Sequence, residues 1–295
     1  MKYVITGSLG NISKPLTQHL VKAGNDITVI SSKAEKQQEI EALGAKAAIG
    51  SVEDITFLTH AFAGADAIYT MVPPNMTATN WVGYIHGIGK NYSAAIKAAG
   101  VKKVVNLSSI GAHMPEGCGP VSGLYYVEQE LNQLEGVDIK HLRPGFFFTN
   151  LYANIGMIKH MGIMGGNYGE NTKMVMVHPN DIATAAAEEL LSPTFTGKSI
   201  RYVMSDEPTT SEIAATIGAA IGQPELPWVN FKNEDALNGM LQAGMPAEIA
   251  NKYVEMGDAM ATGKMTADYI HHQPVASATK LADFAQEFAA AFAHA

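Results

Sequence analysis

Short apolar runs alternate with longer amphipathic stretches through the first half of the chain. Runs rich in Val, Ile and Tyr, each followed closely by glycine, proline or serine, are typical of buried strands. Six such runs predict strands, at residues 2–6, 26–30, 45–49, 67–72, 104–107 and 139–142. The intervening stretches predict helices at residues 15–21, 35–43, 81–99 and 124–134, and a further helix that ends at Phe62. This alternation predicts an α/β fold of the Rossmann type, a doubly wound parallel sheet with helices on both faces.

The second half of the chain has a different pattern, with methionines and glycines crowded into residues 157–166. A strand is predicted at 199–204. Helices are predicted from Asn180 or Asp181, either of which is a suitable cap, to Leu191, and then at 211–221, 234–242 and 247–262. A last helix repeats Leu281, Phe284, Phe288 and Phe292 at helical spacing, which indicates core packing. We expect residues 1–150 to form the Rossmann core. Residues 151–295 should form mainly a smaller substrate-binding lobe, with some elements returning to the core.

The turn after the first predicted strand has the composition of a phosphate-binding loop. Residues 7–12 read Gly-Ser-Leu-Gly-Asn-Ile, between a strand and a helix. Glycines there let the backbone approach a pyrophosphate, and the helix N-terminus offers unpaired N–H groups. The usual third glycine is replaced by Ser13. An ordinary strand-to-helix turn is the alternative, but the position directly after an N-terminal apolar strand favours a dinucleotide site.

The end of the second predicted strand indicates which dinucleotide is bound. Residues 31–33 read Ser-Ser-Lys, and no carboxylate follows until Glu35. An NAD-selective site has an acidic residue here for the ribose hydroxyls, whereas hydroxyls and a cation suit a 2′-phosphate. The sequence therefore favours NADP over NAD, with a serine-capped helix start as the alternative interpretation.

Composition limits the kind of partner. The chain has 295 residues, of which 47% are hydrophobic and 16% charged, and a formal net charge of -8. This acidic balance argues against nucleic acid as a partner. A single cysteine, Cys118 in a glycine-rich run, excludes an internal disulfide and a multi-cysteine metal site, and we expect it to be a loop residue rather than a nucleophile. No signal peptide or membrane-spanning run is visible, so we expect a cytoplasmic protein with no membrane partner and no metal.

With these residues in view, the chain resembles the NmrA-like branch of the atypical short-chain dehydrogenases/reductases. The matching motifs occur in order over residues 2 to 292. They are Gly7-x-x-Gly10, Val72-Pro73-Pro74-Asn75, Leu107-Ser108-Ser109, Leu142-Arg143-Pro144-Gly145-Phe146-Phe147 with Asn150, and His178-Pro179-x-Asp181-Ile182-Ala183. Within that family, the chain is most similar to NADPH-dependent quinone reductases and triphenylmethane-dye reductases.

The resemblance implies a set of cofactor-binding residues. They are Gly7, Ser8, Leu9, Gly10, Asn11 and Ile12 at the phosphates, Ser31, Ser32 and Lys33 at the ribose phosphate, Ser51 and Val52 at the adenine, Met71, Val72 and Pro73 along the path to the second ribose, and Ser108, Ser109, Pro144, Gly145 and Phe146 at the nicotinamide. The phenylalanines 146–148 and the methionine- and glycine-rich segment 157–166 are candidates for an apolar substrate pocket, since methionine adapts to flat ligands. The candidate pocket residues are Phe147, Asn150 and Met164, and core packing is the alternative for any single methionine.

The chain departs from the family pattern at the catalytic helix. Short-chain dehydrogenases use Tyr-x-x-x-Lys, in which the lysine lowers the pKa of the tyrosine. The corresponding stretch begins Tyr125-Tyr126, and four residues further on lies Gln129 or Glu130, depending on the register. Neither replaces the lysine, which disfavours alcohol–ketone chemistry and sugar-nucleotide epimerisation. Tyr126 is the remaining candidate for a proton donor or positioning residue.

A conjugated acceptor makes weaker demands on a catalytic acid, since orientation in an apolar pocket suffices for hydride transfer. We therefore expect an NADPH-dependent reductase of a quinone or similar small conjugated molecule, acting as a monomer or homodimer. The alternative is a dinucleotide-sensing regulatory protein without catalysis, which the missing lysine favours.

Overall fold

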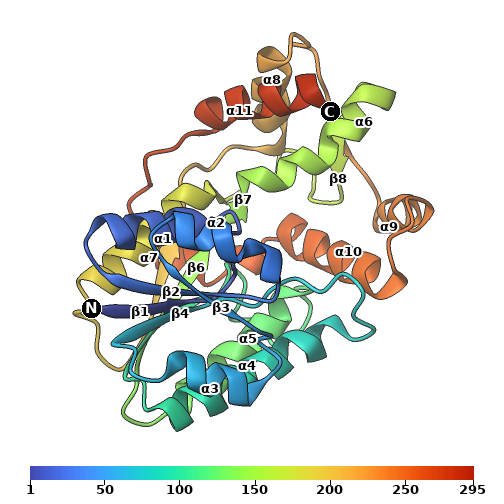
Figure 1. Cartoon of the computed structure of the whole chain (residues 1–295). Coiled ribbons are helices and arrows are strands. Elements are labelled where there is room, and N and C mark those ends of the chain that lie inside the picture. Colours follow the sequence, from blue (N-terminus) through green and yellow to red (C-terminus); the bar gives the residue numbers. More distant parts are fainter.

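The computed structural model describes all 295 residues, and its centre is a seven-stranded parallel sheet (Figure 1). The strand order is β10-β6-β5-β4-β1-β2-β3. The strands are β1 (Lys2–Ile5), β2 (Asp26–Ser31), β3 (Lys46–Ile49), β4 (Ala67–Thr70), β5 (Lys103–Leu107), β6 (Asp138–Pro144) and β10 (Lys198–Val203). All six pairings are parallel, which confirms the predicted Rossmann-type fold.

Helices cover both faces of this sheet, because strand residues on both faces are apolar and need cover. One face carries α1 (Ser13–Lys22), α2 (Gln37–Ala42) and α7 (Pro179–Leu191), and the other carries α3 (Ile55–Phe62), α4 (Trp81–Ala99) and α5 (Val121–Asn132) (Figure 1). Each layer encloses its own buried cluster of side chains.

The strand order reverses between β1 and β4, which lie side by side although β2 and β3 separate them in sequence. In open α/β sheets the crevice at such a reversal, beyond the carboxyl ends of the strands, binds the ligand. The loops after β1 and β4 are therefore the expected position of a ligand-binding site.

The chain after β6 builds a lobe above the carboxyl edge of the sheet (Figure 1). Its elements are β7 (Phe146–Phe147), a 3-10 helix (Phe148–Asn154), α6 (Ile155–Met161), β8 (Met164–Gly166), β9 (Met176–Val177), α8 (Thr210–Ala220), β11 (Trp228–Asn230), α9 (Asn233–Gln242), α10 (Ala247–Ala261), two further 3-10 turns (Lys264–Thr266 and Tyr269–His271) and α11 (Leu281–His294). β7 pairs with β9, and β8 pairs with β11.

The lobe core also includes part of the Rossmann half. Ile110, Cys118 and Val121, from the connection between β5 and the start of α5, pack with Phe148 and Met265 of the lobe. In the other direction, α7 and β10 return to the central sheet. None of the helices is long and apolar enough to cross a lipid bilayer.

Two local predictions have different outcomes. Phe284 and Phe288 of α11 are fully buried, as their spacing indicated. The expected cap of α7 by Asn180 or Asp181 is wrong. The His178 ring occupies the capping position and accepts a hydrogen bond from the Asn180 backbone N–H at 3.1 Å. The Asp181 carboxylate instead accepts a hydrogen bond from the Ser205 hydroxyl at 2.7 Å.

Candidate dinucleotide and acceptor site

The turn after β1 has the geometry that a phosphate loop requires. Gly7 has a φ of +91°, in the left-handed region, and a Cβ there would lie 2.5 Å from the Ser13 Oγ and 2.9 Å from the Met71 Cγ. Ser13 donates its hydroxyl hydrogen to the Thr6 carbonyl at 2.8 Å. A small residue at position 13 therefore lets the helix start close to the strand, which is the role of the third glycine in the usual fingerprint.

The outer side of this turn is open. Gly10 and Asn11 are exposed, and a Cβ on Gly10 would meet only the Gly7 carbonyl, at 3.2 Å. The first turn of α1 has no side-chain cap and no acidic residue. Unpaired N–H groups, a backbone that a ligand can approach and the absence of a carboxylate all fit a pyrophosphate.

The end of β2 fits a ribose phosphate in part. Ser31 is buried, and its hydroxyl hydrogen bonds with the Ser8 hydroxyl at 2.9 Å, so it braces the phosphate turn. Ser32 and Lys33 are exposed, and Lys33 forms no ion pair. Nearby Lys36 is paired with Glu39 at 2.8 Å. Lys33 is therefore the cation left free at the tip of β2, where a 2′-phosphate needs one.

The remaining adenine-side and ribose-side positions are held by backbone contacts. Ser51 is exposed, and Val52, half-buried, accepts a hydrogen bond from the Asn91 side chain through its carbonyl at 3.3 Å. Met71 donates its N–H to the Thr6 hydroxyl at 2.8 Å, and its carbonyl accepts from the Tyr92 hydroxyl at 2.6 Å. These contacts fix the loop after β4 against β1.

Val72 and Pro73 continue the same loop and are half-buried. The Pro73 carbonyl accepts a hydrogen bond from the Tyr84 hydroxyl of α4 at 3.3 Å. The predicted path between the two riboses is therefore a loop anchored at several points.

Ser108 lies at the end of β5, but its side chain is turned under α5 rather than toward the crevice. It is only 4% exposed and donates its hydroxyl hydrogen to the Glu128 carboxylate at 2.5 Å. Glu128 also binds Arg143 of the Arg-Pro-Gly motif, with contacts of 2.6 and 3.0 Å. The neighbouring Ser109 keeps part of its surface exposed. Of the two predicted serines, Ser109 is the one with surface available to a ligand.

This buried ion pair extends into the lobe. Arg143 also binds Asp268 at 2.9 Å and the Tyr202 hydroxyl at 3.2 Å, and the Tyr202 hydroxyl donates to Asp268. Burial opposes the charge on Arg143, but its hydrogen bonds and ion pair with Glu128 raise the pKa of Arg143 above its ordinary value. The role of Glu128 is not predicted from the sequence. A carboxylate on the face of a helix that packs against apolar strands needs a buried partner, and this is the sequence signal that could have identified Glu128.

The segment after β6 separates two environments. Pro144 and Gly145 are buried, and Gly145 packs directly against the Val175 backbone. Phe147 packs against the core on the α1 and α7 face of the sheet, the same core that Leu9 and Met71 pack against. Phe146 turns to the lobe and meets the Tyr168 ring edge-on, with 5.8 Å between ring centroids.

The other two predicted pocket residues have different exposures. Asn150 is exposed. Met164 is fully enclosed in the lobe core, with no exposed surface. Assigning Met164 to the pocket wall is therefore wrong for this structure, because buried packing leaves it nothing to present to a ligand.

Tyr126 lies on the side of α5 that faces α4. Its ring stacks on His86 with 5.0 Å between centroids, and His86 in turn bonds Glu130 at 2.8 Å. Gln129 is exposed on the same helix. The helix α5 contains no lysine, so it lacks the tyrosine–lysine pair of the family pattern.

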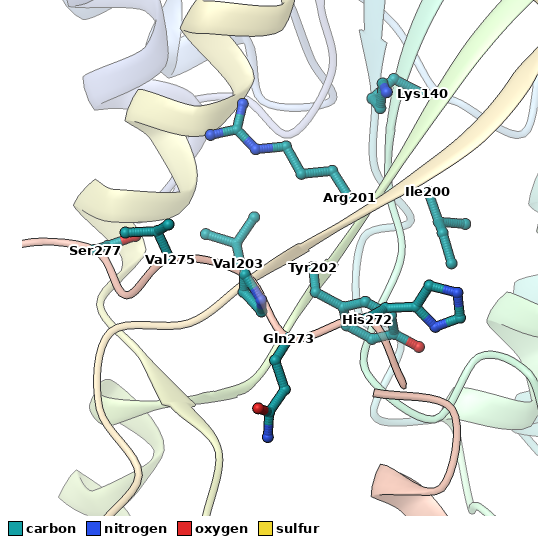
Figure 2. A pocket seen from close by; sticks show the side chains of 10 residues that line it. Lys140, Ile200, Arg201, Tyr202, Val203, His272, Gln273, Val275 and Ser277 are labelled. Atoms are coloured by element: carbon teal, nitrogen blue, oxygen red, sulfur yellow. The ribbon is translucent and has the colours of Figure 1, made fainter. Parts of the chain in front are cut away.

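Two other features are a buried thiol and a cavity at the edge of the sheet. Cys118 is buried, and burial raises the pKa of its thiol to about 12, which keeps it protonated at neutral pH. A cavity of about 510 Å³ runs along the free edge of β10, where the Tyr202 and His272 side chains lie together (Figure 2). Strands β6 and β5 separate β10 from β4, so this cavity is distinct from the strand-reversal crevice.

Comparisons with known proteins agree with this geometry. The sequence profile of the family described as NAD(P)H-binding matches residues 7–193. The chain is 26% identical over 294 residues to the NAD(P)H azoreductase of Xenophilus azovorans, covering 98% of each chain. Its fold is similar to that of the NADPH-dependent quinone oxidoreductase of Escherichia coli complexed with NADPH, with a TM-score of 0.84, 22% identity and coverage of 97% and 99%. It is also similar to the triphenylmethane reductase of Citrobacter sp. complexed with NADP(H), with a TM-score of 0.80, 21% identity and coverage of 98% and 100%.

Proposed function

Because this chain belongs to the NAD(P)H-binding family, in keeping with its resemblance to NmrA-like atypical short-chain dehydrogenases/reductases, we propose that it is an NADPH-dependent reductase. The acceptor is a quinone or a similar small conjugated molecule. The observation that carries the proposal is the open glycine turn at the strand reversal. A half-buried aromatic pair, Phe146 and Tyr168, follows the end of β6. The full-length match to an azoreductase and the similar folds of quinone and dye reductases support it.

The residues present fit the dinucleotide. Gly7 and Gly10 leave room for the phosphates, the start of α1 offers N–H groups, and Lys33 stands free for a 2′-phosphate. When bound, NADPH supplies a hydride, which with one proton from water converts a quinone to a hydroquinone. The free Lys33, with no acidic residue at the end of β2, supports NADPH over NADH.

The protein side of the reaction is orientation and exclusion of water. Leu9, Met71 and Phe147 all pack against the core on the α1 and α7 face of the sheet, and Phe146 and Tyr168 form an aromatic pair that packs against the lobe core. An acceptor held flat against such a surface is positioned for hydride transfer without an ionised tyrosine. The lack of a lysine on α5 after Tyr126 is compatible with this chemistry, because a conjugated acceptor is already electrophilic.

The experiment is NADPH oxidation, followed by absorbance, with a naphthoquinone, an azo dye and a cationic triphenylmethane dye. We expect saturable turnover with at least one of them, and faster turnover with NADPH than with NADH at equal concentrations. Tight NADPH binding with no turnover of any acceptor would contradict a reductase and favour the dinucleotide-sensing alternative.

A further inference from the structure

An aromatic surface runs from the end of β6 across the lobe. Phe146 contacts Tyr168, and Tyr168 contacts Trp228 of β11, with 5.9 Å between ring centroids. On the far side, Tyr253 of α10 meets Trp81 of α4 edge-on at 5.3 Å. Phe146, Tyr168, Trp228 and Tyr253 are only partly buried, although they pack against the cores on either side. We name Phe146, Tyr168 and Trp228 the aromatic wall.

The aromatic wall holds hydrogen-bond donors that the protein does not use. The indole Nε1 of Trp228 is buried and has no acceptor. The Tyr168 hydroxyl takes part in no hydrogen bond, whereas five of the eleven tyrosines (Tyr3, Tyr84, Tyr92, Tyr202 and Tyr269) donate theirs. The fully buried polar atoms without a partner do not include the Tyr168 hydroxyl, so this hydroxyl is partly accessible to solvent. An unused phenol beside flat apolar rings is suited to a planar ligand that carries a hydrogen-bond acceptor.

We propose that Tyr168 binds the acceptor, donating its phenolic hydrogen to the carbonyl oxygen or azo nitrogen of a planar conjugated molecule that lies against the aromatic wall. This inference rests on the proposed function and replaces Tyr126, which stacks on α4, as the tyrosine that touches the acceptor. Hydride uptake by a quinone leaves negative charge on its oxygen, and a donor aimed at that oxygen stabilises the charge. Burial and the neighbouring Tyr253 raise the pKa of Tyr168 to about 12, so the phenol remains a donor at neutral pH.

The chemistry of the acceptor provides a test that a purely structural role would not pass. A quinone or azo compound gains negative charge at the atom that accepts the hydrogen bond. A cationic triphenylmethane dye loses its positive charge at carbon and has no such atom. Tyr168→Phe keeps the ring contacts with Phe146 and Trp228 and removes only the hydroxyl. We expect kcat/KM for a naphthoquinone to fall about tenfold, kcat/KM for the dye to stay within about twofold, and Tm to stay unchanged.

Tyr152→Phe is the matched control. Tyr152 is a half-buried tyrosine whose hydroxyl is also unbonded, but its ring packs on Phe284 and Phe288 rather than on a ring of the aromatic wall. It should leave both acceptors unaffected. Equal losses with quinone and dye in Tyr168→Phe, or no loss with either, would overturn the inference while leaving the reductase proposal intact.

A binding measurement keeps the inference testable even without turnover. The chain has two tryptophans, so Trp81→Phe leaves Trp228 as the only one. In that background, a naphthoquinone added to the NADP⁺-loaded protein should quench Trp228 fluorescence, and adding Tyr168→Phe should raise its Kd several-fold. No quenching, or the same Kd in both proteins, would show that the acceptor binds elsewhere.

Discussion

Single side chains decide how this dinucleotide site departs from the usual pattern. Ser13 occupies the position where a third glycine is expected. Its hydroxyl donates a hydrogen bond to the Thr6 carbonyl, so the side chain fits close to Gly7. The Ser31 hydroxyl is hydrogen bonded to Ser8 and so stabilises the turn. Lys33 is then the group that is available for a phosphate. Ser108 is likewise occupied by Glu128. Hydroxyls that the sequence presents as equivalent therefore have different roles.

Lys33→Ala should weaken NADPH binding about five- to tenfold and leave NADH binding nearly unchanged, because one charge-assisted contact with a 2′-phosphate is lost. Calorimetric titration of both dinucleotides measures this. Lys36→Ala is the control, since Lys36 is already paired with Glu39. Equal effects of Lys33→Ala on NADPH and NADH would place the 2′-phosphate elsewhere.

Tyr126→Phe should retain most of the turnover with quinones. The ring stacking on His86 survives the change, and no lysine is present on α5 to make the hydroxyl a better acid. Positioned acid catalysis supplies about a hundredfold or more, so steady-state rates separate the two cases. A collapse of kcat with unchanged NADPH affinity would show that Tyr126 acts as a proton donor in the reaction.

The candidate site is formed where strands end and helices begin. The phosphate turn joins β1 to α1, and its two glycines serve different purposes. Gly7 has a left-handed backbone and is enclosed by Ser13 and Met71, whereas Gly10 is exposed and faces outward. We propose that Gly7 serves the fold and that Gly10 serves the ligand.

Gly10→Val should abolish dinucleotide binding with little change in Tm, because the branched side chain fills the space in front of the helix start. Gly7→Ala should also destabilise the protein by about 1–3 kcal/mol, since its φ disfavours any side chain. Thermal unfolding and NADPH titration of both variants separate the two roles. Normal NADPH affinity in Gly10→Val would mean that the phosphates do not cross this turn.

A buried chain of polar side chains links the central strands. The Thr70 hydroxyl bonds Asn106 at 2.9 Å, Asn106 bonds the His141 Nδ1 at 3.1 Å, and the His141 Nε2 bonds Asn132 at 3.0 Å. These partners suit a neutral imidazole that accepts at Nδ1 and donates at Nε2. Burial lowers the pKa of His141 from 6.5 to about 4.

His141 makes stability depend on pH. Its contribution is fully present above pH 6.5 and is lost as the pH falls toward 4, because the unfolded state binds the proton first. The free energy of unfolding should fall by about 2 kcal/mol between pH 7.5 and pH 5 from this group. Urea unfolding at both values, compared with His141→Gln, measures it. The variant should show a smaller pH dependence, and an unchanged one would assign the effect to other groups.

Across the protein, the Rossmann half and the lobe are built into each other. The sheet needs β10 and α7 from beyond residue 178, and the lobe core needs Ile110, Cys118 and Val121. The ion pair between the buried Arg143 and the half-buried Asp268 joins the two halves. We propose that residues 1–150 and 151–295 are functional regions of one cooperative unit.

This arrangement predicts a single unfolding transition for the full chain. A fragment of residues 1–150 should give no cooperative transition, because it lacks the edge strand β10 and exposes the α7-facing side of the sheet. Circular dichroism during urea unfolding tests both statements. Two separate transitions in the full chain would contradict the cooperative unit.

The sequence by itself determined the strands, the helices and the phosphate turn. Local backbone preferences and the spacing of apolar residues are properties of neighbouring positions, and they produced the parallel fold, the Gly7–Ile12 loop and the Phe284–Phe288 stripe. Only the tertiary structure decided which side chains are available. Met164 is enclosed and Ser108 is used by Glu128, whereas the Tyr168 hydroxyl is unused. Exposure and hydrogen-bond partners depend on contacts between residues far apart in sequence, which no local pattern records.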